Sequence, residues 1–163
     1  MQQSYGRVAG IDETICPKQL MEDALKLNAG ALERHGVEVK REYQQPPPIV
    51  VDKHKILQIL LNLINNAKYA CSEVEGDKSI TLRIDNPAST RVRFQVVDNG
   101  IGILPENLTR IFQHGFTTRK SGHGFGLHSG ALAARELGGH LVAHSAGLYT
   151  GATFTLNYPA TRR

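Results

Sequence analysis

The stretch DNGIGILPENLTRIFQHGFTTRKSGHGFG, residues 98–126, carries the most informative pattern in this sequence of 163 residues. Its glycines include two pairs: Gly100 with Gly102, and Gly124 with Gly126. Glycine lets a backbone come close to a ligand, and the exposed amides can then bind anions. Hydroxyl and basic side chains stand between the two pairs, at Thr117, Thr118, Arg119 and Lys120. The pattern predicts a nucleotide pocket that is closed by a mobile lid.

The composition is that of one globular domain, with 40% hydrophobic and 21% charged residues. The net charge of +4 is small and the basic residues are scattered, unlike the dense basic stripe of nucleic-acid-binding proteins. Cys16 and Cys71 are far apart in helical patterns, which favours a reduced intracellular chain over a disulfide framework. No apolar run approaches the ~18–20 residues of a membrane span. We therefore expect a cytoplasmic location, with no nucleic-acid partner and no direct membrane contact.

Hydrophobic periodicity predicts alternating groups of helices and strands. Helical spacing predicts helices over residues 17–34, 53–71, 105–112 and 125–137. Period-two alternation predicts strands over residues 37–43, 80–85, 92–98, 140–144 and 153–158. Pro87 is expected in the connection between two strands, and residues 1–13 show no convincing period. Because the order is not a strict βαβ alternation, we expect a two-layer α/β sandwich with helices on one face of a sheet.

Three asparagines, Asn62, Asn65 and Asn66, stand close together on the longest predicted helix. Asn62 and Asn66 are four residues apart and therefore lie on one helix face. Asparagine is unfavourable inside a helix because its side chain competes for backbone hydrogen bonds. Amide oxygens of this kind can hold Mg²⁺ beside substrate phosphates. The alternative interpretation is an ordinary polar edge of the helix.

Three further motifs are each weak alone. Asp98 would end a buried strand, where its carboxylate needs a donor such as an adenine amino group; an Asp-Asn-Gly turn is the alternative. The segment 122–127 precedes a predicted helix, whose N-terminal amides can bind an anion. The segment 151–154 is by itself a turn that leads into a strand. The sequence contains neither a P-loop nor a protein-kinase signature.

Four motifs resemble, in this order and spacing, the N, G1, G2 and G3 boxes of the GHKL superfamily of gyrase, Hsp90, MutL and histidine kinases. They are the asparagines of the longest predicted helix, the motif that begins at Asp98, the segment 122–127 and the segment 151–154. Ile111-Phe112 and Phe116-Thr117-Thr118 resemble the F box of the histidine-kinase branch. The resemblance covers about residues 12–160. It implies the Bergerat fold, a mixed sheet of about five strands under three helices. It also implies a catalytic domain that transfers the γ-phosphoryl group of ATP to a histidine of a separate dimerisation domain.

The resemblance also implies roles for individual residues. Asn66 would be the Mg²⁺ ligand and Asp98 would bind the adenine. Asn62, Asn66 and Lys120 would form the catalytic set, with Arg119 or Lys120 at the γ-phosphate. The other implied nucleotide contacts are Ala70, Gly100, Gly102, Ile103, Thr117, Thr118, Gly122, His123, Gly124, Phe125, Gly126, Leu127 and Thr153. The implied cofactors are ATP and Mg²⁺.

Three departures from the family pattern bear on the chemistry. GHKL ATPases usually carry a glutamate base four residues before the Mg²⁺ asparagine, and here that position is Asn62. This disfavours hydrolysis and suits transfer to an imidazole, whose neutral nitrogen is already nucleophilic. Many histidine kinases have a basic residue where this chain has Tyr69, with Lys68 one position early. The last box reads Gly151-Ala152 in place of Gly-Thr, so a hydroxyl contact with adenine is either lost or made by Thr153.

None of the seven histidines stands in a phosphoacceptor motif such as H-E-[ILV]-[RK]-N-P. We therefore expect residues 1–11 to be a tail from a preceding dimerisation or linker segment, and 12–163 to be the catalytic domain of a longer sensor. The expected partners are a His-containing dimerisation domain and a response-regulator receiver domain. The isolated chain is expected to be monomeric and its parent homodimeric. A hydrolysing ATPase of the MutL or Hsp90 type and a nucleotide-free docking module are the alternatives.

Overall fold

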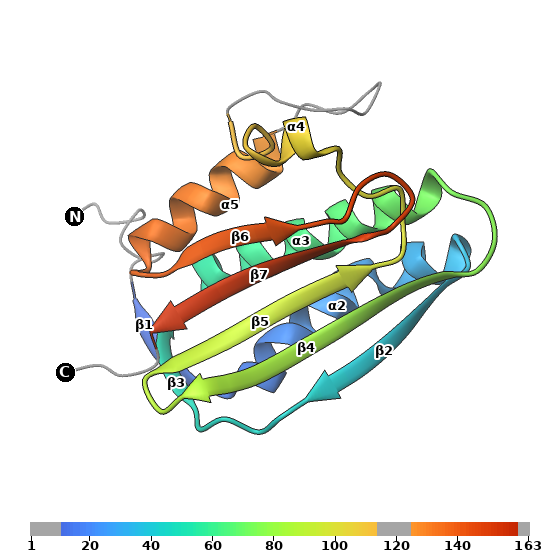
Figure 1. Ribbon diagram of the computed structural model, residues 1–163. Coiled ribbons are helices and arrows are strands. Elements are labelled where there is room, and N and C mark those ends of the chain that lie inside the picture. Colours follow the sequence, from blue (N-terminus) through green and yellow to red (C-terminus); the bar gives the residue numbers. More distant parts are fainter. Residues whose placement is uncertain (1–10, 114–124, 160–163) are drawn as a thin grey trace, which may run out of the picture.

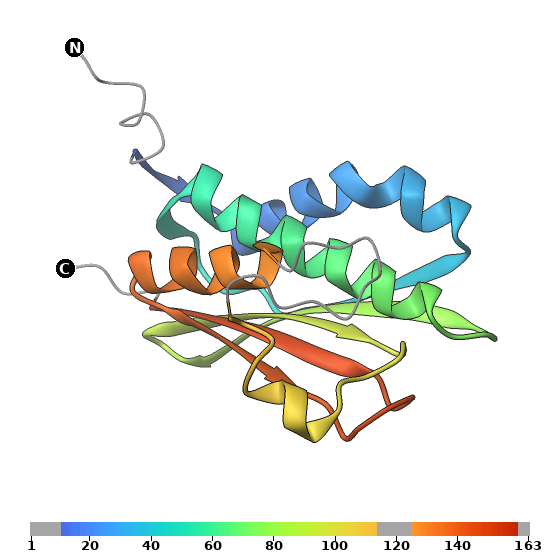
Figure 2. The same ribbon diagram turned by 90° about the horizontal axis from the view of Figure 1, so that it is seen from above.

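The computed structural model describes residues 11–113 and 125–159. In this part of the chain, three long helices cover one face of a five-stranded sheet (Figures 1 and 2). The long helices are α2 (Pro17–Arg34), α3 (Lys53–Ser72) and α5 (Phe125–Glu136). The short α4 (Pro105–Leu108) lies outside this helix layer. The predicted two-layer sandwich is confirmed.

The strands of the main sheet run in the order β2-β4-β5-β7-β6. Their bounds are Val37–Tyr43 for β2, Lys78–Ala88 for β4, Arg91–Asp98 for β5, Ala152–Pro159 for β7 and His140–His144 for β6. β2 is parallel to β4, and the other neighbours are antiparallel, so the sheet is mixed. In the register of β5 and β7, Asp98 faces Ala152. The end of β5 and the start of β7 therefore meet at one end of the sheet.

A second, two-stranded sheet was not predicted from the sequence. It pairs β1 (Asp12–Ile15) antiparallel with β3 (Ile49–Asp52). β1 is largely exposed, so its residues show no apolar alternation that would reveal a strand. β3 has only four residues and directly follows the exposed Pro47 and Pro48. A strand this short beside prolines shows no recognisable alternation in the sequence.

Two element boundaries differ from the sequence prediction. Pro87 lies inside the end of β4, where the pairing with β5 shifts register, and a bulge tolerates a residue without an amide hydrogen. The helix predicted over 105–112 ends at Leu108, and turns follow it. Ile111 is buried there through its packing in the core rather than through helical periodicity.

Helix α3 is the centre of the helix layer and has an apolar stripe that faces the sheet. Its buried residues recur at helical spacing: Ile56, Ile59, Leu60, Leu63, Ile64, Ala67 and Cys71. Asp52 caps the helix by accepting a hydrogen bond from the Lys55 amide at 3.2 Å. The helical spacing was predicted from the sequence. A neighbouring edge of α3 carries polar side chains.

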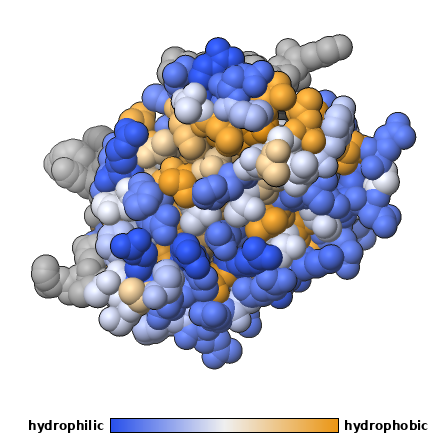
Figure 3. All heavy atoms as spheres, in the orientation of Figure 1, coloured by the Kyte–Doolittle hydropathy of each residue, from blue (hydrophilic) through white to orange (hydrophobic). Residues whose placement is uncertain are grey.

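The face of the sheet away from the helices is hydrophilic over most of its area (Figure 3). Across this face, Arg83 pairs with Glu42 at 2.7 Å and Gln95 donates to the Thr155 hydroxyl at 3.0 Å. Polar cross-strand pairs of this kind allow a sheet face to contact water. A second helix layer is therefore not required. Among the described residues, no helix is long and apolar enough to cross a membrane.

Tyr158 links the two sheets. Its side chain is 1% exposed, and its hydroxyl donates to the backbone carbonyl of Val50 in β3 at 2.6 Å. The substitution Tyr158→Phe should lower the free energy of unfolding by about 1–2 kcal/mol, because it removes a hydrogen bond to a part-buried carbonyl. Urea unfolding measures this change. Tyr149→Phe, at a tyrosine that is 71% exposed, is the matched control and should stay within about 0.5 kcal/mol of the wild type.

Candidate functional site

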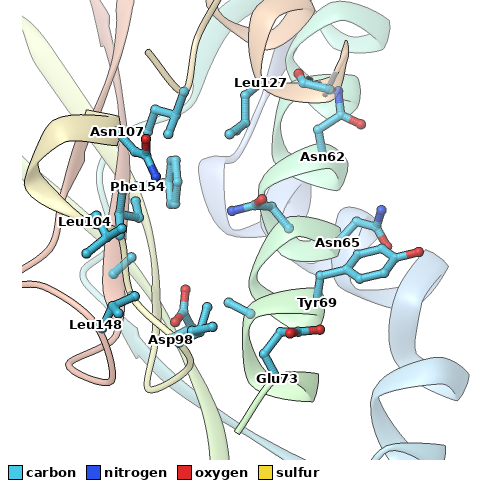
Figure 4. A pocket seen from close by; sticks show the side chains of 18 residues that line it. Asn62, Asn65, Tyr69, Glu73, Asp98, Leu104, Asn107, Leu127, Leu148 and Phe154 are labelled. Carbon is cyan, nitrogen blue, oxygen red and sulfur yellow. Dashed lines mark hydrogen bonds between the residues drawn. The ribbon is translucent and has the colours of Figure 1, made fainter. Parts of the chain in front are cut away.

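A cavity of about 320 Å³ opens between α3 and the end of the sheet where β5 stops and β7 begins. One wall is the polar edge of α3 (Figure 4). The residues of this wall repeat at intervals of three and four: Asn62, Asn65, Asn66, Tyr69, Ala70 and Glu73. This spacing places them on one helix face, beside the stripe that packs on the sheet. The three asparagines thus line a cavity rather than a plain polar surface.

The other walls come from four separate segments and are mainly apolar. The chain after β5 contributes Ile101, Gly102, Ile103, Leu104, Asn107 and Ile111. The remaining wall residues are Gly126 and Leu127 of α5, Leu148 of the β6–β7 loop, and Ala152 and Phe154 of β7. Leu127, Leu148 and Phe154 flank the cavity across from α3 (Figure 4). An amide-bearing wall therefore faces an apolar one, which suits a flat ligand that carries a polar end.

Asp98 lies at the bottom of the cavity and is 4% exposed. Its Oδ1 accepts a hydrogen bond from the Gly100 amide at 2.8 Å. Its Oδ2 is buried and has no hydrogen-bond partner among the described residues. Burial raises the pKa of Asp98 to about 6, against the opposing effect of the Gly100 and Ala152 amides. The carboxylate therefore offers an unused acceptor to a donor that enters the cavity.

Two glycines after Asp98 allow the chain to pack against its surroundings. A Cβ on Gly100 would lie 2.4 Å from the Ala70 carbonyl in the last turn of α3, and the Ile101 amide donates to that same carbonyl at 3.0 Å. Gly102 has a φ of +77°, and a Cβ there would lie 2.1 Å from the Gly147 carbonyl oxygen. Any side chain at either position would push the loop away from α3 or from the β6–β7 loop. The glycines thus set the shape of this wall.

Asn62 and Asn66 have different surroundings although they share a helix face. The Asn62 side-chain nitrogen donates to the Gly126 carbonyl in the first turn of α5 at 3.3 Å. Its oxygen accepts from the Gln58 amide, also at 3.3 Å. Asn66 makes no hydrogen bond to a described residue and is half-buried in the cavity wall. Asn62 therefore joins α3 to α5, while the amide of Asn66 is available to a ligand.

The structure brings together most of the site residues that were predicted from the sequence and lie in its described part. The predicted residues that line the cavity are Asn62, Asn66, Ala70, Asp98, Gly102, Ile103, Gly126 and Leu127. Gly100 does not line the cavity, but its backbone amide donates a hydrogen bond to the Asp98 carboxylate. For Phe125, only its place as the first residue of α5 is described. The predictions for Thr117, Thr118, Arg119, Lys120, Gly122, His123 and Gly124 lie outside the described residues.

Thr153 does not line the cavity, contrary to the sequence-based expectation. Its neighbours Ala152 and Phe154 both do, and side chains alternate between the two faces of a strand. The hydroxyl of Thr153 therefore belongs to the opposite face of the sheet. Lys68 does not line the cavity either, and its ammonium lies 5.6 Å from the centre of the Tyr69 ring.

Several cavity residues were missed by the sequence analysis. Tyr69 and Glu73 follow Asn62 and Asn66 at helical spacing, so extending that face along the helix would have found them. Leu104, Asn107, Leu148 and Phe154 come from loops and a strand far from α3 in sequence. Phe154 belongs to the segment 151–154 that the sequence analysis singled out, whereas no local pattern identifies Leu104, Asn107 and Leu148. Only the tertiary structure brings these residues together at the cavity.

Comparison with known proteins places this cavity in a family. Residues 51–162 match the family described as histidine kinase-, DNA gyrase B- and HSP90-like ATPase. The chain is 40% identical over 123 residues to the sensor protein ChvG of Agrobacterium fabrum, across 68% of this chain and 20% of that protein. It is 32% identical over 130 residues to the sensory histidine kinase/phosphatase NtrB of Rhizobium meliloti, across 71% of this chain and 33% of that protein. The chain thus spans a third or less of the length of these two relatives.

Solved structures confirm the fold. The catalytic domain of histidine kinase ThkA superposes with a TM-score of 0.79 at 23% identity, over 93% of this chain and 99% of that chain. Full-length ShkA in complex with AMPPNP superposes with a TM-score of 0.80 at 26% identity, over 99% of this chain and 32% of that chain. The two-layer arrangement is therefore shared with both proteins.

The buried carboxyl of Asp98 should make stability depend on pH. Its pKa is raised from 3.8 to about 6 in the folded protein, so between these values the folded state binds more protons than the unfolded chain. The contribution of Asp98 to stability is thus present at acidic pH and lost as the pH rises through about 6. Asp98→Asn should therefore be more stable than the wild type above pH 7, by up to about 3 kcal/mol, and equal to it near pH 4.

Urea unfolding of both proteins between pH 4 and 8 measures this difference. Asp77→Asn, at an exposed carboxylate, is the control and should show no such growth of the difference with pH. A constant difference between Asp98→Asn and the wild type across the range would contradict the raised pKa.

Proposed function

The chain belongs to the histidine kinase-, DNA gyrase B- and HSP90-like ATPase family, and we propose that it is the ATP-binding catalytic domain of a sensor histidine kinase. The observation that carries the proposal is the unpaired Oδ2 of Asp98 at the bottom of a cavity with apolar walls. A neutral, flat base with an exocyclic amino group fits both features at once. Adenine is such a base.

The adenine would enter between the loop at Gly102 and the apolar residues Leu148 and Phe154. Its amino group would donate to Oδ2 of Asp98, while Oδ1 keeps its bond to the Gly100 amide. A hydrogen bond to a buried charged acceptor contributes more than a neutral one, about 1.5–3 kcal/mol. This contact would therefore be a large part of the affinity. The AMPPNP named with the similar ShkA structure supports a nucleotide in this cavity.

The phosphates would extend from the base along the asparagine edge of α3 toward α5. Asn66 in the wall of the cavity offers a side-chain amide oxygen that has no hydrogen-bond partner among the described residues. Mg²⁺ binds few protein oxygens because phosphates and water supply the rest. The residues present thus fit a Mg²⁺ ion held with ATP. The described residues contain no cluster of three or more His, Cys, Asp or Glu side chains that would hold a metal alone. Bound Mg²⁺ would neutralise phosphate charge.

We propose phosphoryl transfer to a histidine rather than hydrolysis. The bond between the γ-phosphorus and the β–γ bridging oxygen of ATP breaks and ADP leaves with that oxygen, while a bond from the γ-phosphorus to a neutral imidazole nitrogen forms and the other ring nitrogen releases its proton to solvent. Such a step needs positioning and charge neutralisation more than a general base. Asn62 stands where an ATPase of this superfamily would carry a glutamate. Its amide donates to Gly126 and has no basic group for activating water.

The phosphoacceptor and the partners lie outside this chain in our proposal. A His-containing dimerisation domain would supply the imidazole, and a response-regulator receiver domain would accept the phosphoryl group from it. The sensor and histidine-kinase names of the relatives support this assignment. Residues 1–11 would be the tail of the preceding segment, 12–163 the catalytic domain, and Lys120 or Arg119 the γ-phosphate contact. The parent protein would be a homodimer.

Two substitutions should separate base binding from metal binding. Asp98→Asn leaves one acceptor oxygen for both the Gly100 amide and the ligand, so the affinity for ADP should fall by at least about tenfold with or without Mg²⁺. Asn66→Ala should remove most of the gain in ATP affinity that Mg²⁺ gives and change metal-free binding little. Isothermal titration calorimetry measures both.

Asn65→Ala is the matched control for Asn66. Asn65 lies next to it on α3 and borders the cavity, but its side chain lies on the side of the helix away from Asp98 (Figure 4). It should retain ATP affinity within about threefold of the wild type. Wild-type affinity in both Asp98→Asn and Asn66→Ala would refute the site.

The function itself is tested by calorimetry with ATP, with and without Mg²⁺, alongside an assay of phosphate release. The wild-type chain should bind ATP in a magnesium-dependent way and release negligible phosphate, because Asn62 stands where a hydrolysing member of the superfamily would carry a water-activating glutamate. Sustained release would place the chain in the hydrolysing branch of the family. No binding would leave the fold intact and remove the proposed function.

A further inference from the structure

A single hydroxyl, that of Ser145, joins the two loops that form one end of the cavity. Ser145 follows β6 and begins the loop that leads to β7. Its Oγ accepts a hydrogen bond from the Ile103 amide at 2.9 Å and another from the Gly147 amide at 3.2 Å. The same hydroxyl donates to the Gly151 carbonyl at 2.7 Å, and the Gly147 carbonyl is a second, longer acceptor at 3.3 Å. A serine hydroxyl has one hydrogen to donate and two lone pairs, so the shorter bond to Gly151 is its main donor bond.

These bonds fix the position of the loop after Asp98. Besides the bond from Ile103 to Ser145, the Tyr149 amide donates to the Ile101 carbonyl at 2.6 Å, and the Gly151 amide donates to the Gly100 carbonyl at 3.2 Å. The two loops therefore run together through three hydrogen bonds. Two of these are between backbone groups, and only the Ile103–Ser145 bond depends on a side chain.

The close approach of the two loops leaves this hydroxyl little freedom. A Cβ on Gly102 would lie 3.2 Å from the Ser145 Oγ, next to its clash with the Gly147 carbonyl. Gly102 and Ile103 both line the cavity, whereas Ser145 does not. The hydroxyl thus lies behind the wall that contacts the ligand. It acts on that wall through the backbone.

We propose that Ser145 is a positioning residue for nucleotide binding, whose hydroxyl holds Gly102 and Ile103 in the conformation that receives the base. This rests on the proposed function of the same cavity. Without the hydroxyl, the Ile103 amide loses its acceptor and the Gly151 carbonyl loses its donor. Binding then has to order the segment of Gly102 and Ile103, and the free energy that this ordering costs lowers the affinity for the base. The effect belongs to the base end of the cavity and is independent of Mg²⁺.

The chain offers a matched control in the same loop. The Thr150 hydroxyl donates to the Gly147 carbonyl at 2.6 Å, so its bond stays inside the β6–β7 loop and does not reach Ile103. Thr150 is exposed and does not line the cavity. Thr150→Ala therefore removes a hydroxyl and a hydrogen bond of similar length without releasing the wall.

The test compares Ser145→Ala, Ser145→Cys, Ser145→Thr and Thr150→Ala with the wild type. Calorimetry with ADP should show a loss on the order of tenfold for Ser145→Ala and Ser145→Cys, equal with and without Mg²⁺. Ser145→Thr keeps the hydroxyl and should restore affinity to within about threefold, and Thr150→Ala should match the wild type. The cysteine variant keeps the side-chain volume, so it carries the test if the alanine variant does not fold.

Amide hydrogen exchange supplies a second measurement that general destabilisation would not reproduce. Exchange of the Ile103 amide in the nucleotide-free protein should be faster in Ser145→Ala and unchanged in Thr150→Ala. If the wild type binds ADP and the serine variants bind it equally well, this inference is wrong while the proposed function stands. Weaker binding with unchanged exchange at Ile103 would also overturn it. If the wild type does not bind ADP, the proposed function and the inference about Ser145 are both wrong.

Discussion

The site depends on the close contact between the end of β5 and the last turn of α3. β5 is a central strand, so its last residue, Asp98, is buried between the sheet and the helix layer. Gly100 then lets the chain touch the Ala70 carbonyl, and the Ile101 amide bonds to it. This contact closes the bottom of the cavity and holds the buried carboxylate in place. A larger residue at Gly100 would separate α3 from the sheet at the point where the ligand is expected.

The burial of Asp98 lowers the stability of the empty domain and at the same time provides a hydrogen-bond acceptor for the proposed base. Desolvation disfavours the charged carboxylate and raises its pKa to about 6, so at neutral pH the empty site holds a destabilising charge. Only one of its oxygens is satisfied within the described chain. A ligand that donates to the other oxygen would recover part of this cost. The group that lowers the stability of the empty domain is thus the group that would recognise the base.

Two asparagines on one face of α3 have different roles. Asn62 is used inside the protein to connect α3 with the Gly126 carbonyl of α5, and Asn66 remains available to the cavity. The bond to Gly126 places the start of α5 beside the asparagine edge. Anions bind well at helix N-termini because amide groups point outward there. In the proposed complex, the phosphate end of the ligand would therefore meet amides from two helices, while its base would meet an apolar wall.

The sequence by itself determined the long helices, the strands of the main sheet and the polar face of α3. Periodicity is a local property, so the stripe of Ile56 and Leu60 and the spacing of Asn62 and Asn66 could be read directly. The motif order predicted a nucleotide site at Asp98, and the structure has a cavity at that residue. The β1–β3 sheet was not predicted because both strands have only four residues and β1 is largely exposed. Thr153 was misplaced because its inward or outward orientation depends on the register of β7.

Only the tertiary structure decided which distant residues complete the cavity. Leu104, Leu148 and Phe154 have no shared pattern, and they meet because the order β5-β7-β6 brings three chain segments to one end of the sheet. The role of Ser145 likewise depends on the register that places the β6–β7 loop beside Ile103. Local sequence fixes the conformation of each segment, whereas the contacts between segments follow from how the whole chain packs.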